Sequence, residues 1–170
     1  MKKSRIVIFV SILICILFCS PVWAEGWANT NWGMSISEVE KAINGKVIAN
    51  EGGQVYSHKL QNKLSVDKYN FEVMFHFTNN KLDKVLLRNE TDDYHVAYLF
   101  LLDELKKKYG APSDGPKNVR NPLGRREKVE WVTKGMVIDL STSFDVLGGK
   151  TYKMTAVIYD SRKSESSEKL

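Results

Sequence analysis

The feature that most constrains the fold is the alternation of apolar and polar residues along most of the chain after residue 45. The clearest example is the run 71–77, in which phenylalanine or valine occupies every second position. Side chains alternate between the two faces of a strand, so this pattern predicts a strand with one buried face. Turn-forming residues separate further such runs, at 47–48, 54–60, 64–69, 82–88, 128–133, 136–143 and 152–160.

Two segments have a helical period instead. Ser35 and Glu38 have the spacing of a capping box, and Gly45 is placed to end that helix in the left-handed conformation. A second stripe runs from Tyr94 to Tyr109, follows Asp92 and Asp93, and stops at Gly110. The order is therefore helix, strands, helix, strands.

This order predicts an α+β fold in a single domain over residues 32–160. We expect two helix-plus-antiparallel-meander units, at 32–90 and 91–160, with the helices packed on one face of an antiparallel sheet. Residues 25–31 form a polar lead-in and residues 161–170 a polar tail.

Residues 1–24 have the pattern of a signal peptide. Three basic residues precede an apolar run at 6–18, and small or β-branched residues place cleavage after Ala24. The apolar run is shorter than the roughly 20 residues that span a bilayer, so no membrane anchor is expected after cleavage. Acylation at Cys19 is the less favoured alternative, because Phe18 stands where a lipoprotein signal has a small residue. We expect a periplasmic or secreted protein.

The net charge and the cysteine content further limit the classes of function that the protein can have. The leader carries three basic and no acidic residues, so the formal net charge falls from +5 for the full chain to +2 after cleavage. Near-neutral charge and export argue against nucleic-acid binding. Both cysteines, Cys15 and Cys19, leave with the leader, so the exported domain has no disulfide.

No catalytic, metal or cofactor site is predicted. His58 and His76 lie on strands that can be neighbours, but their spacing matches no metal motif, and His95 is expected to support a helix start. Carboxylates alternate with core positions and are expected to face solvent, at Glu72, Asp139 and Asp160.

Two features are candidates for partner binding. The segment 111–126 is predicted to be a long polar connection that carries four basic residues, Lys117, Arg120, Arg125 and Arg126. These suit an anionic partner or surface, although a merely solvated loop is the alternative. Trp27 lies in the polar lead-in and is expected to be exposed.

The run from Trp32 to Val39 resembles the Gly-Met-Ser/Thr helix entry of the outer-membrane-assembly lipoproteins of the SmpA/OmlA (BamE) type. Phe75 and Phe77 followed by Asn80-Lys81-Leu82 look like the hairpin of that group. The resemblance implies a doubled helix-and-meander unit like that of the β-lactamase-inhibitor-protein fold.

These observations predict an exported, non-catalytic protein of the cell envelope that binds a protein partner or assists assembly. A secreted inhibitor of a hydrolase is one alternative. A periplasmic ligand-binding protein or hydrolase is another, which a pocket between helix and sheet would favour.

Overall fold

The computed structural model describes residues 26–51, 55–121, 124–147 and 150–161. The leader predicted at 1–24 and the tail from residue 162 lie outside these residues. The described residues hold two helices, α2 (Ile36–Ile43) and α3 (Tyr94–Tyr109). Neither is long and apolar enough to cross a membrane.

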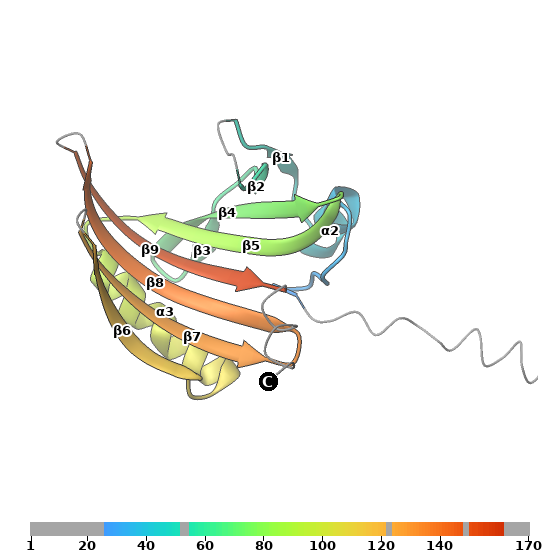
Figure 1. The fold of residues 1–170 in the computed structure, drawn as a ribbon. Coiled ribbons are helices and arrows are strands. Elements are labelled where there is room, and N and C mark those ends of the chain that lie inside the picture. Colours follow the sequence, from blue (N-terminus) through green and yellow to red (C-terminus); the bar gives the residue numbers. More distant parts are fainter. Residues whose placement is uncertain (1–25, 52–54, 122–123, 148–149, 162–170) are drawn as a thin grey trace, which may run out of the picture.

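Nine strands of the described residues form one antiparallel sheet in the order β1-β2-β4-β5-β9-β8-β7-β6, with β3 paired to β4 beside this path (Figure 1). Their bounds are β1 (Val47–Ala49), β2 (His58–Leu60), β3 (Leu64–Val66), β4 (Tyr69–Thr78), β5 (Lys81–Glu90), β6 (Asp114–Asn121), β7 (Gly124–Thr133), β8 (Met136–Leu147) and β9 (Lys150–Asp160).

The predicted fold class is wrong. The structure is mainly β, and its strands do not form two separate helix-plus-meander units. The reason is the pairing of β5 with β9, which runs from Lys84 opposite Asp160 to Glu90 opposite Met154. Each of these strands ends one half of the chain, so their pairing joins the strands of both halves into one sheet. Local alternation predicts strands but does not say which strands pair.

The prediction of a long polar connection at 111–126 is also wrong, because most of this segment forms β6 and the start of β7. Gly115 and Pro116 in this segment suggested a loop. β6 is an edge strand of the sheet. A proline is tolerated there because no further strand needs its missing amide as a hydrogen-bond donor. The pairing with β7 is irregular between Asp114 and Lys117, at the proline.

The helix predicted to follow the Ser35–Glu38 capping box is confirmed as α2, although its end differs from the prediction. The Glu38 carboxylate accepts hydrogen bonds from the Ser35 amide and hydroxyl, both at 2.8 Å. Asn44, not Gly45, takes the left-handed conformation, with φ of 48°. Gly45 packs closely against Leu60 instead, since a Cβ there would lie 2.9 Å from Leu60 Cδ1 and would require that side chain to shift.

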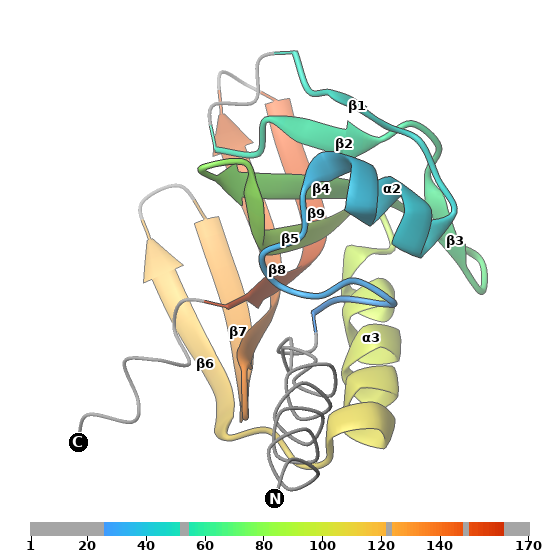
Figure 2. The same cartoon turned by 90° about the vertical axis from the view of Figure 1, so that its right-hand side faces the viewer.

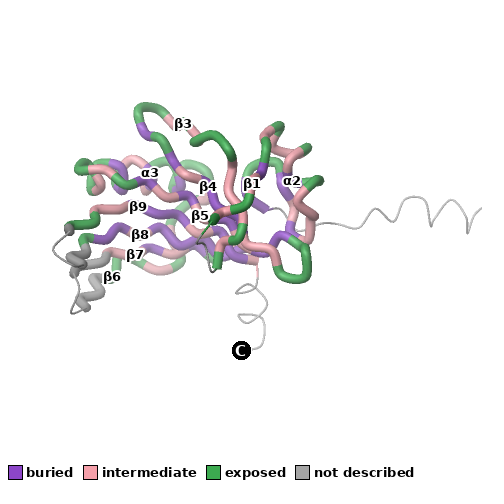
Figure 3. The backbone as a smooth tube through the Cα atoms, turned by 90° about the horizontal axis from the view of Figure 1, so that it is seen from above, coloured by how far each residue is buried: buried purple, intermediate pink, exposed green. Residues whose placement is uncertain are grey.

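α3 has the predicted bounds and contacts β5, β8 and β9, while α2 lies near β1 (Figure 2). The buried residues of α3 are Ala97, Tyr98, Leu101 and Leu105. Gly110 ends the helix with φ of 81° and accepts a hydrogen bond from the Trp131 indole at 3.0 Å. Buried stretches run along the middle strands of the sheet (Figure 3).

The β5–β9 pairing makes the two halves of the chain one cooperative unit, which can be tested at Val157. This residue is 1% exposed and lies opposite Leu87 on β5. We expect Val157→Ala to lower the free energy of unfolding by about 2 kcal/mol. Circular dichroism and tryptophan fluorescence should report one shared transition, because Trp27 and Trp32 lie in one half and Trp131 in the other.

The matched control is Val132→Ala on β7, where the side chain is 42% exposed. This change should alter stability by no more than about 0.5 kcal/mol. Two separate transitions in the Val157→Ala protein would contradict the single sheet.

Candidate functional site

The face of the sheet that α3 covers carries two apolar rows and then a polar row. In the first row Trp131, Ile138, Tyr159 and Val85 lie opposite one another across β7, β8, β9 and β5. The second row, two residues along, is also apolar: Val129, Leu140, Val157 and Leu87. The third is polar: Glu127, Thr142, Thr155 and Asn89. The hydrophobic core therefore stops at one level on all four strands.

Three members of this polar row are buried. Thr142 is 4%, Thr155 0% and Asn89 7% exposed. The Thr155 hydroxyl donates to the Tyr94 carbonyl of α3 at 2.5 Å, and the Thr142 hydroxyl donates to the Met154 carbonyl at 3.2 Å. The Asn89 amide nitrogen donates to the Asn70 carbonyl at 2.8 Å. The row thus ties the start of α3 to the sheet.

The Tyr98 hydroxyl and the Asn89 amide oxygen are among the buried side-chain atoms of the described residues that have no hydrogen-bond partner, as are the Trp32 indole nitrogen and the Tyr69 hydroxyl. Tyr98 is 3% exposed. Burial raises the pKa of Tyr98, and the negative charge of Glu127 raises it further, so the phenol stays neutral. A buried polar atom without a partner costs on the order of 1–3 kcal/mol, which makes such atoms informative about function.

A cavity of about 350 Å³ lies between the start of α3 and this end of the sheet. It is lined by Tyr94 and His95 of α3, Glu127 of β7, and Thr142 and Phe144 of β8. The His95 ring stacks on the Tyr98 ring with centroids 6.2 Å apart. The cavity therefore combines aromatic walls with part of the polar row.

A second cavity of about 470 Å³ shares Phe144 with the first. Its other lining residues belong to β5, the segment before α3, and β9: Glu90, Thr91, Asp92, Thr151, Tyr152 and Lys153. Phe144 is 36% and Tyr152 45% exposed. The Lys153 ammonium is held by Asp92 at 2.9 Å. We take the two cavities together as the candidate site.

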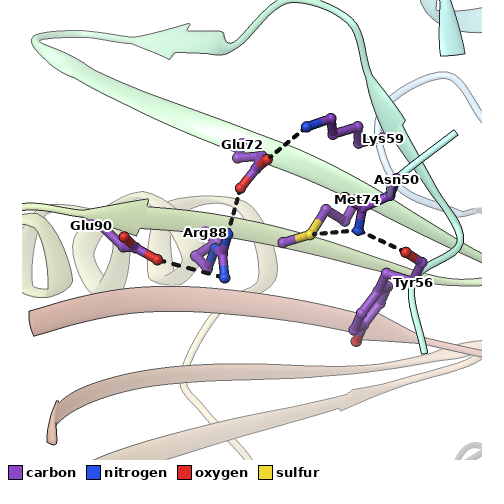
Figure 4. Close-up of polar contacts among 7 residues, drawn as sticks. All are labelled: Asn50, Tyr56, Lys59, Glu72, Met74, Arg88 and Glu90. Atoms are coloured by element: carbon purple, nitrogen blue, oxygen red, sulfur yellow. Dashed lines mark hydrogen bonds and ion pairs between the residues drawn. The ribbon is translucent and has the colours of Figure 1, made fainter. Parts of the chain in front are cut away.

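The opposite face of the sheet holds a ladder of charges across β2, β4 and β5 (Figure 4). Glu72 contacts Lys59 at 3.6 Å and Arg88 at 2.7 Å, and Arg88 also contacts Glu90 at 3.5 Å. Partial burial raises the pKa of Glu72, but Arg88 and Lys59 outweigh it and hold that pKa below its usual value. These charges already neutralise one another, so this face offers less to a charged ligand.

The structure separates the two histidines that were considered for a shared metal. His58 lies opposite Phe75 in the sheet, while His76 is the next residue on that strand and points to the other face. His76 contacts Asp83 and packs against Tyr56. Within the described ranges, no cluster of three or more metal-ligating side chains occurs.

Two of the three carboxylates expected to face solvent are buried, which corrects that prediction. Asp139 is 8% and Asp160 4% exposed. Asp139 contacts Lys128 at 2.9 Å and Asp160 contacts Lys84 at 2.7 Å. Long lysine side chains cover this face of the sheet, so acidic residues there are paired and buried.

The predicted partner-binding residues lie in different parts of the fold, and Arg125 lies opposite the cavity-lining Phe144 in the β7–β8 pair. Trp27 is 9% exposed, and its ring meets Phe75 edge-on at 6.3 Å, so its expected exposure is wrong. Lys117 is exposed and pairs with Asp114. Arg120 and Arg125 occupy opposite positions of the β6–β7 pair, and Arg126 lies opposite Val119. The side chains of these three arginines lie outside what the structure describes.

Sequence reasoning missed Asn89, Thr142, Thr155 and Glu127. A signal was present, because the inward positions of four strands each show two apolar residues followed by a polar one. Only the register shows that these polar residues share one row.

Comparison with known proteins gives one finding. A family model, the TP0088 domain, matches residues 25–162. No curated protein and no solved structure shows a significant match to the chain.

The different hydrogen bonding of two buried hydroxyls predicts opposite effects on stability. We expect Tyr98→Phe to leave the free energy of unfolding unchanged or to raise it by up to about 1 kcal/mol, because it removes a buried hydroxyl without a partner. Thr155→Val should lower it by about 1 kcal/mol or more, because the Tyr94 carbonyl then loses its donor. Urea unfolding of both variants measures the difference. An equal loss in both would mean that Tyr98 has a partner.

Proposed function

Since the chain belongs to the TP0088 domain family, whose name carries no activity, we propose a function from the site itself. The protein is a non-catalytic domain of the cell envelope that binds a small ligand between α3 and the sheet. The cavity between α3 and the sheet carries this proposal, because the rings of Tyr94, His95 and Phe144 and the polar groups of Glu127 and Thr142 meet there.

The form of the site supports ligand binding. Ligand sites in proteins are concave and contain polar groups that fix the orientation of the ligand. The 350 Å³ cavity has the rings of Tyr94 and Phe144 as apolar walls and Glu127 and Thr142 as polar groups. Its volume lies within the range of small-molecule sites, roughly 300–1,000 Å³.

The same lining supports binding rather than covalent catalysis. Among the residues that the structure describes, the lining of the smaller cavity includes a threonine but no serine, cysteine or lysine. Its threonine, Thr142, already donates its proton to the Met154 carbonyl. A nucleophile needs a base within hydrogen-bond distance, and Thr142 is committed elsewhere.

The cell-envelope location is part of the proposal and rests on the leader pattern at residues 1–24. It predicts that the exported protein begins at Glu25 and carries no lipid. Intact-mass spectrometry of the protein from envelope fractions checks both points. A mass that corresponds to a lipid-modified chain beginning at Cys19 would show a lipoprotein instead.

Binding can be tested by filling the cavity. We expect ligand-observed NMR with a library of small aromatic and amine fragments to find binders of the wild-type protein. Thr142→Leu places a larger side chain at the cavity wall and should abolish this binding. The control is Ser141→Leu, the same final residue at the adjacent position on the opposite face of β8.

Circular dichroism establishes that both variants remain folded before their binding is compared. Fragments that bind wild type and Thr142→Leu equally would refute a site in this cavity. The absence of any binder of the wild-type protein would count against ligand binding itself.

A further inference from the structure

The end of α2 joins an asparagine to a glycine, and Asn44 is the one asparagine in the sequence that a glycine follows. Asn44 is exposed and takes the left-handed conformation, with φ of 48° and ψ of 46°. Asparagine tolerates this conformation better than most residues that have a side chain. Gly45 packs against Leu60, where a Cβ would require the leucine side chain to shift. The way in which α2 ends therefore favours both residues of the pair, each for its own reason.

An asparagine that precedes a glycine can be modified without an enzyme. The glycine backbone nitrogen loses its proton and attacks the side-chain carbonyl carbon of the asparagine, so that a C–N bond forms and the side-chain nitrogen leaves as ammonia. Water then opens the resulting succinimide ring at one of its two carbonyl groups. Opening at one carbonyl gives aspartate, and opening at the other gives isoaspartate, in which the backbone runs through the former side chain. Glycine favours the attack because it has no Cβ to hinder it.

The folded end of α2 holds the reacting atoms apart. With ψ of Asn44 at 46°, the Gly45 nitrogen lies nearly anti to the Asn44 Cβ across the Cα–C bond, whereas ring closure needs these two atoms on the same side. The Gly45 amide also donates a hydrogen bond to the Glu40 carbonyl at 3.1 Å. Ring closure therefore requires the backbone to turn and this hydrogen bond to break.

Water, which the second step consumes, reaches the end of α2. Asn44 and Gly45 line an open depression of about 630 Å³, together with Ser37, Glu40, Lys41 and Lys46. The conformation of the backbone, and not access of water, therefore limits the reaction in the folded protein.

We propose that Asn44 is a site of spontaneous modification to aspartate and isoaspartate, and that the folded end of α2 suppresses the reaction until this end opens. Local opening of an element costs less free energy than unfolding of the whole chain. Isoaspartate places an additional backbone atom between residues 44 and 45, which disrupts the hydrogen bond from the Gly45 amide to Glu40. Aspartate leaves the backbone unchanged and tolerates the left-handed conformation. Isoaspartate therefore keeps the end of α2 open, while aspartate does not.

Peptide mapping by mass spectrometry at mildly alkaline pH tests the proposal, with the protein either folded or unfolded in guanidinium chloride. We expect Asn44 to react faster than every other asparagine of the unfolded protein. It should react at least tenfold more slowly in the folded protein than in the unfolded one. Asn121 is an internal control, because it precedes Pro122, whose nitrogen has no proton to lose. Enzymatic methylation of isoaspartate distinguishes the two products.

Two variants are expected to open the end of α2. Val39→Ala removes a side chain that is 0% exposed, and Glu40→Ala removes the carboxylate that accepts a hydrogen bond from the Val47 amide at 2.9 Å. Both should raise the rate at Asn44 in the folded protein at least threefold and leave the rate in the unfolded protein unchanged. Val132→Ala, the matched control on β7, should change neither rate. Circular dichroism checks that the variants are folded, and Glu40→Ala decides the test if Val39→Ala is not.

Contrary results overturn separate parts of the proposal. If Asn44 of the unfolded protein reacts no faster than the other asparagines, residue 44 is not a modification site. Equal rates in the folded and the unfolded protein would show that the helix end gives no protection. If no folded variant of α2 reacts faster than the wild-type protein, the reaction does not proceed through opening of the helix end.

Discussion

The antiparallel pairing of β5 with β9 is the interaction on which the rest of the structure depends. Among the described residues, it is the only strand pairing that joins the two halves of the chain. It places Leu87 opposite Val157, so the core is continuous across the junction. It also places Asn89 opposite Thr155, which makes the polar row continuous from β5 to β7. Without this pairing neither the sheet nor the candidate site would exist.

The polar row shows a balance between stability and function. Burying a hydroxyl or amide costs free energy unless a partner replaces water. Thr142 and Thr155 recover this cost through backbone carbonyls, while Tyr98 and one atom of Asn89 do not. The Trp32 indole nitrogen and the Tyr69 hydroxyl are also buried without a partner, so such atoms are not confined to the region of the polar row.

The start of α3 determines where the cavity lies. The helix covers the two apolar rows with Leu101, Leu105 and neighbouring residues, and it begins above the polar row, where the Tyr94 carbonyl meets Thr155. Beyond Tyr94 the helix no longer covers the sheet, so the end of β8 keeps an exposed aromatic side chain on that face. The exposure of Phe144, two residues along from Thr142, is therefore a consequence of where α3 begins.

The sequence by itself determined the local elements. The alternation at 71–77 specifies β4, the two asparagines after Thr78 specify its turn, and the stripe from Tyr94 to Tyr109 specifies α3 with its observed bounds. Each follows from interactions between residues close in sequence. Only the tertiary structure decided that β5 pairs with β9, that Gly115 and Pro116 belong to an edge strand, and that Trp27 is buried. It also brought Asn89, Thr142, Thr155 and Glu127 into one row. These outcomes depend on register between distant strands, which the period of a single strand leaves open.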